Sequence, residues 1–189
     1  MNYITRLFSF FIILSVYNSV LARGLDQSSV GLSYGDTYVK QNIKTLNYSE
    51  LFFRKQFPYL TNYLPDFVRP MYELNAGLLS TKAGQGSLVG VGPRLELGLS
   101  KHLSIGGAFR FVYLDKYVYQ APESNNTRHY GGHRQFQYYL ELDYNLNNHV
   151  IIGYRWLHMS NGKQVIPEPL KYDHNPVIET RNLVVRFPF

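Results

Sequence analysis

The chain has 189 residues, a formal net charge of +6 and no cysteine. This length fits one domain, and without cysteines no disulfide can stabilise it, although small exported proteins often depend on such bonds. The basic residues are scattered along the chain and form no run, so we expect no nucleic-acid partner.

The first 22 residues have the features of a secretory signal peptide. Arg6 supplies a positive charge, residues 7–16 form an apolar run, and Val20-Leu21-Ala22 matches a small-residue cleavage site. The apolar run is too short to cross a bilayer. We therefore expect a signal peptide at residues 1–22 and a mature domain at residues 23–189.

The mature chain alternates between apolar and polar residues over long stretches, which predicts strands. Several of these stretches reach the roughly 9–11 residues that a tilted membrane-crossing strand needs. Eight strands are predicted, at residues 28–38, 45–54, 70–82, 86–100, 103–119, 132–145, 149–161 and 177–189.

The connections between these strands are of two kinds. Ser100-Lys101-His102 and residues 145–148 are tight turns, whereas residues 120–131 and 162–176 are long polar loops. Short turns on one side and long loops on the other are typical of outer-membrane barrels, and the 16% aromatic content fits their aromatic girdles. The sequence therefore predicts an all-β fold, an eight-stranded antiparallel transmembrane β-barrel of the outer membrane.

One connection departs from this pattern. Residues 55–69 should form a short periplasmic turn, but this connection is long and rich in aromatic residues. Two interpretations stay open, a periplasmic or interfacial segment and an additional strand.

The last predicted strand has one apolar and one polar face. Its alternation places Leu183, Val185 and Phe187 outside, toward lipid, and Asn182 and Arg186 inside. A terminal Phe189 after alternating apolar residues resembles the C-terminal signature of outer-membrane proteins. Four charged residues of other strands are predicted to form ion pairs in the barrel lumen: Arg94, Glu96, Arg110 and Glu141.

The strongest functional signal is the pair His158 and Ser160. Positions i and i+2 of a strand share a face, about 6.6 Å apart, so a hydrogen bond between these side chains is within reach. A histidine next to a serine hydroxyl is the first requirement for an activated nucleophile. Because Tyr154 and Trp156 lie on the same outward face, the pattern indicates a hydrolase that acts on a lipid.

Counting along the last two strands places Glu179 beside His158 on the outward face. Ser160 would then attack an ester carbonyl, His158 would move the proton, and Glu179 would hold the imidazole. Glu168 and Asp173 are the competing acids.

Oxyanion donors are expected just after the serine. Backbone N–H groups around Gly162 are candidates, and Asn161 or Asn175 could supply a side-chain amide.

Two segments, His158-Met-Ser160-Asn161-Gly162 and Asn175-Pro-Val-Ile-Glu179, resemble the lipid A 3-O-deacylases of the PagL type. The resemblance implies an eight-stranded outer-membrane barrel that hydrolyses the ester-linked acyl chain at position 3 of lipid A. It also implies His158, Ser160 and Glu179 as the triad, and it matches Asn161 and Asn175 to motif positions. The chain departs from the family in having Gly162-Lys163 where Ala-Gly is common, and in a longer segment between Ser160 and Glu179.

The expected partners follow from this assignment. They are lipid A or lipopolysaccharide as substrate and the bacterial outer membrane, with the active site toward the outer leaflet; the exposed aromatic face would allow a homodimer. No cofactor and no metal are expected, because His129 and His133 lack further ligands.

Two other classes of function stay open. One is a non-enzymatic barrel with a structural or adhesive role. The other is a different lipid enzyme, such as a phospholipase or acyltransferase, for which a site inside the lumen would suit an acyl chain held within the barrel.

Overall fold

The computed structural model describes residues 28–37, 46–81, 84–116, 118–120, 127–129, 132–160 and 177–189. The expected signal peptide, residues 1–22, lies outside the described residues. So do Asn161, Gly162 and Asn175, and the competing acids Glu168 and Asp173.

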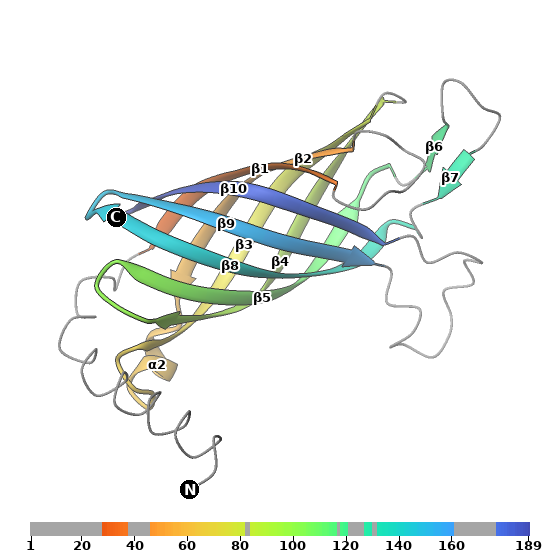
Figure 1. The fold of residues 1–189 in the computed structure, drawn as a ribbon. Coiled ribbons are helices and arrows are strands. Elements are labelled where there is room, and N and C mark those ends of the chain that lie inside the picture. Colours follow the sequence, from red (N-terminus) through yellow and green to blue (C-terminus); the bar gives the residue numbers. More distant parts are fainter. Residues whose placement is uncertain are drawn as a thin grey trace, which may run out of the picture.

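Eight long antiparallel strands close into a barrel, in the spatial order β1-β10-β9-β8-β5-β4-β3-β2 (Figure 1). A two-stranded ribbon, β6 (Val118–Gln120) and β7 (Thr127–His129), lies within the connection between β5 and β8. The prediction of an eight-stranded antiparallel barrel is confirmed. The barrel strands are β1 (Ser29–Thr37), β2 (Asn47–Gln56), β3 (Val68–Thr81), β4 (Gly84–Gly98), β5 (Leu103–Leu114), β8 (Arg134–Asn147), β9 (Val150–Ser160) and β10 (Ile178–Pro188).

The first and last strands close the sheet. β1 pairs with β10 in a register that runs from Ser29 opposite Pro188 to Thr37 opposite Thr180. A closed barrel leaves no unpaired strand edge, which is the condition for crossing a hydrocarbon layer with strands.

The inward side chains in the middle of the barrel, and toward the end with the turns at 100–102 and 145–148, form an ion-pair network. Arg94 Nη2 lies 3.1 Å from Glu96 Oε2 and 3.0 Å from Glu141 Oε1, and Arg110 Nη1 lies 2.6 Å from Glu73 Oε1. The predicted inward ion pairs of Arg94, Glu96, Arg110 and Glu141 are therefore confirmed. An eight-stranded barrel is just wide enough for its side chains to fill the interior.

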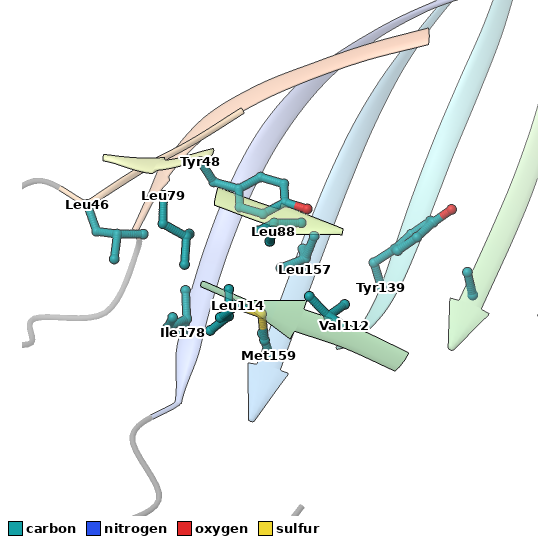
Figure 2. Close-up of a cluster of buried hydrophobic side chains, with 11 residues drawn as sticks. Leu46, Tyr48, Leu79, Leu88, Val112, Leu114, Tyr139, Leu157, Met159 and Ile178 are labelled. Carbon is teal, nitrogen blue, oxygen red and sulfur yellow. The ribbon is translucent and has the colours of Figure 1, made fainter. Parts of the chain in front are cut away.

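Toward the end with the long connections, the interior becomes apolar. Figure 2 shows side chains from β2, β3, β4, β5, β9 and β10 that face one another inside the barrel. At this end, apolar packing replaces the ion pairs. The cluster contains Leu46, Tyr48, Leu79, Leu88, Val112, Leu114, Leu157, Met159 and Ile178, and Ala108 and Tyr139 extend it toward the ion pairs.

The aromatic connection between β2 and β3 contains a short helix, α2 (Pro58–Thr61), and no barrel strand. Pro58 stands at the first helical position, where its missing N–H costs nothing. Figure 1 shows α2 at the end of the barrel that also holds the C-terminus and the β8–β9 turn. Across the described ranges, no helix is long and apolar enough to cross a membrane.

Candidate active site

His158 and Glu179 lie side by side on the outer surface of the barrel. The register of β9 and β10 places them directly opposite each other, and His158 Nδ1 lies 3.3 Å from Glu179 Oε1. Their side chains are 14% and 25% exposed, so neighbouring groups shield most of the pair from the surroundings. This is the placement that the strand count from the sequence predicted.

The contact at Nδ1 decides the role of the other ring nitrogen. When Nδ1–H donates to a carboxylate, Nε2 is left without a proton and can accept one. A neutral His158 held in this tautomer therefore presents a base on the side away from Glu179.

Ser160 follows His158 on the same outward face, at the end of β9, and is half-buried. The neighbouring strand places Phe136 opposite it. Within the described residues, no hydrogen bond joins Ser160 to His158. Such bonds often form only once substrate is bound, so the shared face is the relevant observation.

The other side of His158 is covered by an aromatic ring from β8. Tyr138 lies opposite His158 in the register, and the two rings stack with centroids 4.4 Å apart and planes 22° from parallel. Trp156 contacts both rings, at 6.3 Å from His158 and 5.9 Å from Tyr138. The imidazole thus lies between a carboxylate on β10 and a tyrosine on β8.

The surface beyond these residues differs on the two sides of β9. On the β8 and β5 side, Phe109, Phe111 and Phe136 form a ring cluster with centroids 5.1–5.5 Å apart. On the β10 side, the exposed Arg181 lies opposite Trp156 in the register, two residues from Glu179. The outward face of β9 is therefore bordered by aromatic side chains on the β8 side and by the charged Glu179 and Arg181 on the β10 side.

The three oxyanion candidates Asn161, Gly162 and Asn175 lie outside the described residues, so their roles stay predictions. The described part of the chain contains no cluster of metal-ligating side chains. His133, one of the two histidines considered for a metal, has its Nδ1 2.6 Å from the carbonyl oxygen of Leu114 and stacks on Tyr113.

Sequence reasoning did not identify Tyr138. Counting back from the turn at 145–148 gives its approximate height, but a β-bulge between Asn145 and Asn147 shifts the register of β8 against β9. Strand alternation already places Tyr138 outward and Tyr139 inward, but the bulge offsets the count by one residue and so brings Tyr138 opposite His158.

No family model and no curated protein matches the chain. Among solved structures, it is similar to the outer membrane enzyme PagL, with a TM-score of 0.60 and 12% identity over 85% of this chain and 99% of that one. It is also similar to the N-terminal β-barrel domain of Pseudomonas aeruginosa OprF, with a TM-score of 0.53 and 11% identity over 87% of this chain and 99% of that one. A third similar structure is the Yersinia pestis attachment invasion locus protein Ail, with a TM-score of 0.52, 12% identity and the same coverages. These similarities show the fold, which is a small barrel of the outer-membrane type. The same fold occurs in PagL, an enzyme, and in OprF and Ail, which carry no enzyme name.

Proposed function

We propose that this protein is a serine esterase of the bacterial outer membrane, which hydrolyses the 3-O-linked acyl chain of lipid A. One observation carries the proposal: His158 contacts Glu179 on the outer surface of the barrel, and Ser160 follows on the same face. The fold shared with the outer membrane enzyme PagL supports it.

The reaction would proceed in two steps. Ser160 Oγ attacks the ester carbonyl while His158 Nε2 takes the hydroxyl proton, and the ring then returns that proton to the departing sugar hydroxyl. In the second step, water attacks the acyl-serine ester by the same route and releases a fatty acid. Glu179 accepts the Nδ1–H bond throughout and offsets the charge on the ring.

The negative oxygen that develops at the carbonyl needs hydrogen-bond donors. We assign this role to the backbone N–H groups after Ser160, around Gly162, and to the side-chain amides of Asn161 and Asn175. The resemblance of the two sequence segments to the PagL-type deacylases supports this assignment.

The orientation of the site favours a substrate taken directly from the membrane. Ser160 and His158 point away from the lumen, and the outer part of the lumen is filled by the apolar cluster around Leu157 and Met159. An acyltransferase that holds an acyl chain inside the barrel would need that space. If the protein is an enzyme but not a lipid A deacylase, the alternative is a phospholipase that uses the same outward-facing site.

A barrel without catalytic activity is the second candidate. It is favoured by the similarity in fold to Ail and the OprF domain, whose descriptions name no enzyme. In that case Ser160, His158 and Glu179 would be surface residues whose replacement affects stability alone.

The test is mass spectrometry of lipid A and phospholipids from a Gram-negative host that expresses the protein. Wild type is compared with Ser160→Ala and Glu179→Ala, and with Ser49→Ala, a matched control on β2 that also faces outward. All samples are adjusted to equal amounts of folded barrel.

Loss of one 3-linked acyl group with wild type and Ser49→Ala, but not with Ser160→Ala, would support the deacylase. Phospholipids that lose an acyl chain while lipid A stays intact would favour the phospholipase. Unchanged lipids in every sample would favour the barrel without activity.

A further inference from the structure

We propose that Tyr138 is a positioning residue that fixes the plane of the His158 imidazole. The inference rests on the proposed function, since it assigns a role in the same site. It adds a third strand, β8, to a site that the sequence placed on β9 and β10 alone.

Glu179 and Tyr138 restrain the imidazole in different ways. The carboxylate contacts Nδ1 at 3.3 Å and so holds one edge of the ring. A single contact at an edge still allows the ring to rotate about that contact. The Tyr138 ring, 4.4 Å away and 22° from parallel, lies against the face of the imidazole and opposes this rotation.

The register makes this arrangement a property of the sheet. Tyr138, His158 and Glu179 are opposite one another on three adjacent strands. Side chains opposite each other in antiparallel strands have Cβ atoms about 4.5–5.5 Å apart, which is the spacing of stacked rings. Trp156 meets the Tyr138 ring edge-on, at 5.9 Å and 63°, and thereby supports it.

The stacking of Tyr138 on His158 also stabilises the positive charge that the imidazole gains during the reaction. His158 becomes an imidazolium when it takes the proton of Ser160, and the face of a tyrosine ring attracts a cation. Both effects come from the aromatic ring and neither needs the tyrosine hydroxyl. A phenylalanine at position 138 should therefore replace the tyrosine, whereas an aliphatic residue should not.

The experiment measures steady-state deacylation of lipid A in detergent by wild type, Tyr138→Phe and Tyr138→Leu. Tyr154→Leu is the matched control, because Tyr154 also faces outward and lies on β9, without a ring contact to His158 among the described pairs. We expect Tyr138→Phe and Tyr154→Leu to keep kcat within about twofold. Tyr138→Leu should lower kcat by about tenfold to a hundredfold with little change in KM, the pattern of a misplaced reacting group.

A spectroscopic measurement makes the test independent of turnover. In ¹³C-histidine-labelled barrel with Ser160→Ala, a stacked tyrosine moves the ring C–H resonances of His158 upfield. The resonances are assigned by their loss in His158→Gln. Tyr138→Phe should keep the upfield shift and Tyr138→Leu should abolish it.

Wild-type kcat in Tyr138→Leu would overturn the proposal, and so would resonances that Tyr138→Leu leaves in place. An inactive wild type with intact upfield shifts would instead overturn the proposed function and, with it, any catalytic role of the contact. The two failures are therefore distinguishable.

Discussion

At the scale of single residues, the contact between His158 Nδ1 and Glu179 is the most specific feature of the candidate site. A carboxylate in this position sets the tautomer and stabilises the imidazolium, whereas a neutral amide can do only the first.

Glu179→Gln keeps the size of the side chain and removes its charge. We expect kcat for lipid A deacylation to fall by about a hundredfold or more, within the range of general acid–base contributions. Asp66→Asn, in the exposed segment before β3, removes a charge far from the site and should leave kcat unchanged. Full activity in Glu179→Gln would transfer the role of the acid to Glu168 or Asp173.

Two glycines of β4 give a matched pair for stability. A Cβ at Gly92 would lie 1.9 Å from the backbone oxygen of Phe109, which the sheet holds in place, whereas a Cβ at Gly98 would meet nothing closer than 3.8 Å. Gly92→Ala should lower the free energy of unfolding by about 1–3 kcal/mol, and Gly98→Ala should change it by about 0.5 kcal/mol or less. Urea unfolding in micelles, followed by Trp156 fluorescence, measures both; equal midpoints would contradict the close approach.

At the scale of elements, the inward faces of the strands share one network of charges. Among the described residues, six buried arginines face five buried carboxylates. Glu73 is central to it, because Arg54 Nε and Arg110 Nη1 lie 2.5 and 2.6 Å from its oxygens and the Tyr139 hydroxyl donates to it at 2.6 Å.

Replacing Glu73 by glutamine removes a negative charge that balances the positive charges of two buried arginines, Arg54 and Arg110. We expect Glu73→Gln to lower the free energy of unfolding by about 3 kcal/mol or more, as when one partner of a buried ion pair is removed. The exposed change Asp66→Asn serves as the control, with little expected effect. If both variants unfold at the same urea concentration, the network does not stabilise the barrel in this way.

The segment that contains α2 has an unusual surface for a turn. Tyr59 and Tyr63 are 84% and 86% exposed, and Leu60 and Leu64 beside them are also exposed. Phe57 contacts Tyr72, and Tyr72 contacts Phe53, so the segment continues the aromatic surface of β2 and β3. Aromatic side chains in this arrangement are typical of a membrane–water interface.

Fluorescence tests this placement, because the chain contains one tryptophan. In a Trp156→Phe background, Tyr63→Trp should emit at shorter wavelength than an exposed tryptophan and be quenched by brominated lipids. His149→Trp, in the exposed β8–β9 turn at the same end of the barrel, should be quenched by aqueous acrylamide instead. Identical behaviour of the two variants would place the α2 segment in water.

At the scale of the whole molecule, two kinds of side chains fill the lumen of the barrel. Ion pairs fill its middle, and the apolar cluster around Leu88, Leu114 and Met159 fills the end with the long connections. An eight-stranded barrel has no further room for a water-filled channel.

We therefore expect no ion conductance from the purified barrel in planar lipid bilayers at moderate voltage. A 16-stranded porin reconstituted in the same way provides the positive control. Regular unit conductance steps from this protein would show that the lumen opens, and they would favour a transport function over a surface esterase.

The sequence by itself determined the eight barrel strands, their inward and outward faces and the placement of Glu179 beside His158, but it extended the fifth strand to residue 119, where the structure ends β5 at Leu114 and has the β6–β7 ribbon beyond it. Strand alternation is a local property, and counting from residues 149 and 189, the level ends of the last two strands, brings position 158 beside the start of the last strand. For the same reason, the inward positions of Arg94, Glu96, Arg110 and Glu141 could be predicted.

Only the tertiary structure decided which groups meet across the barrel. The partners of Glu73 come from β2, β5 and β8, and closure of all eight strands sets their distances. The bulge at Asn145 and Asn147 sets which residue of β8 lies opposite His158. Such contacts depend on register and closure between distant segments, and no local pattern of residues contains that information.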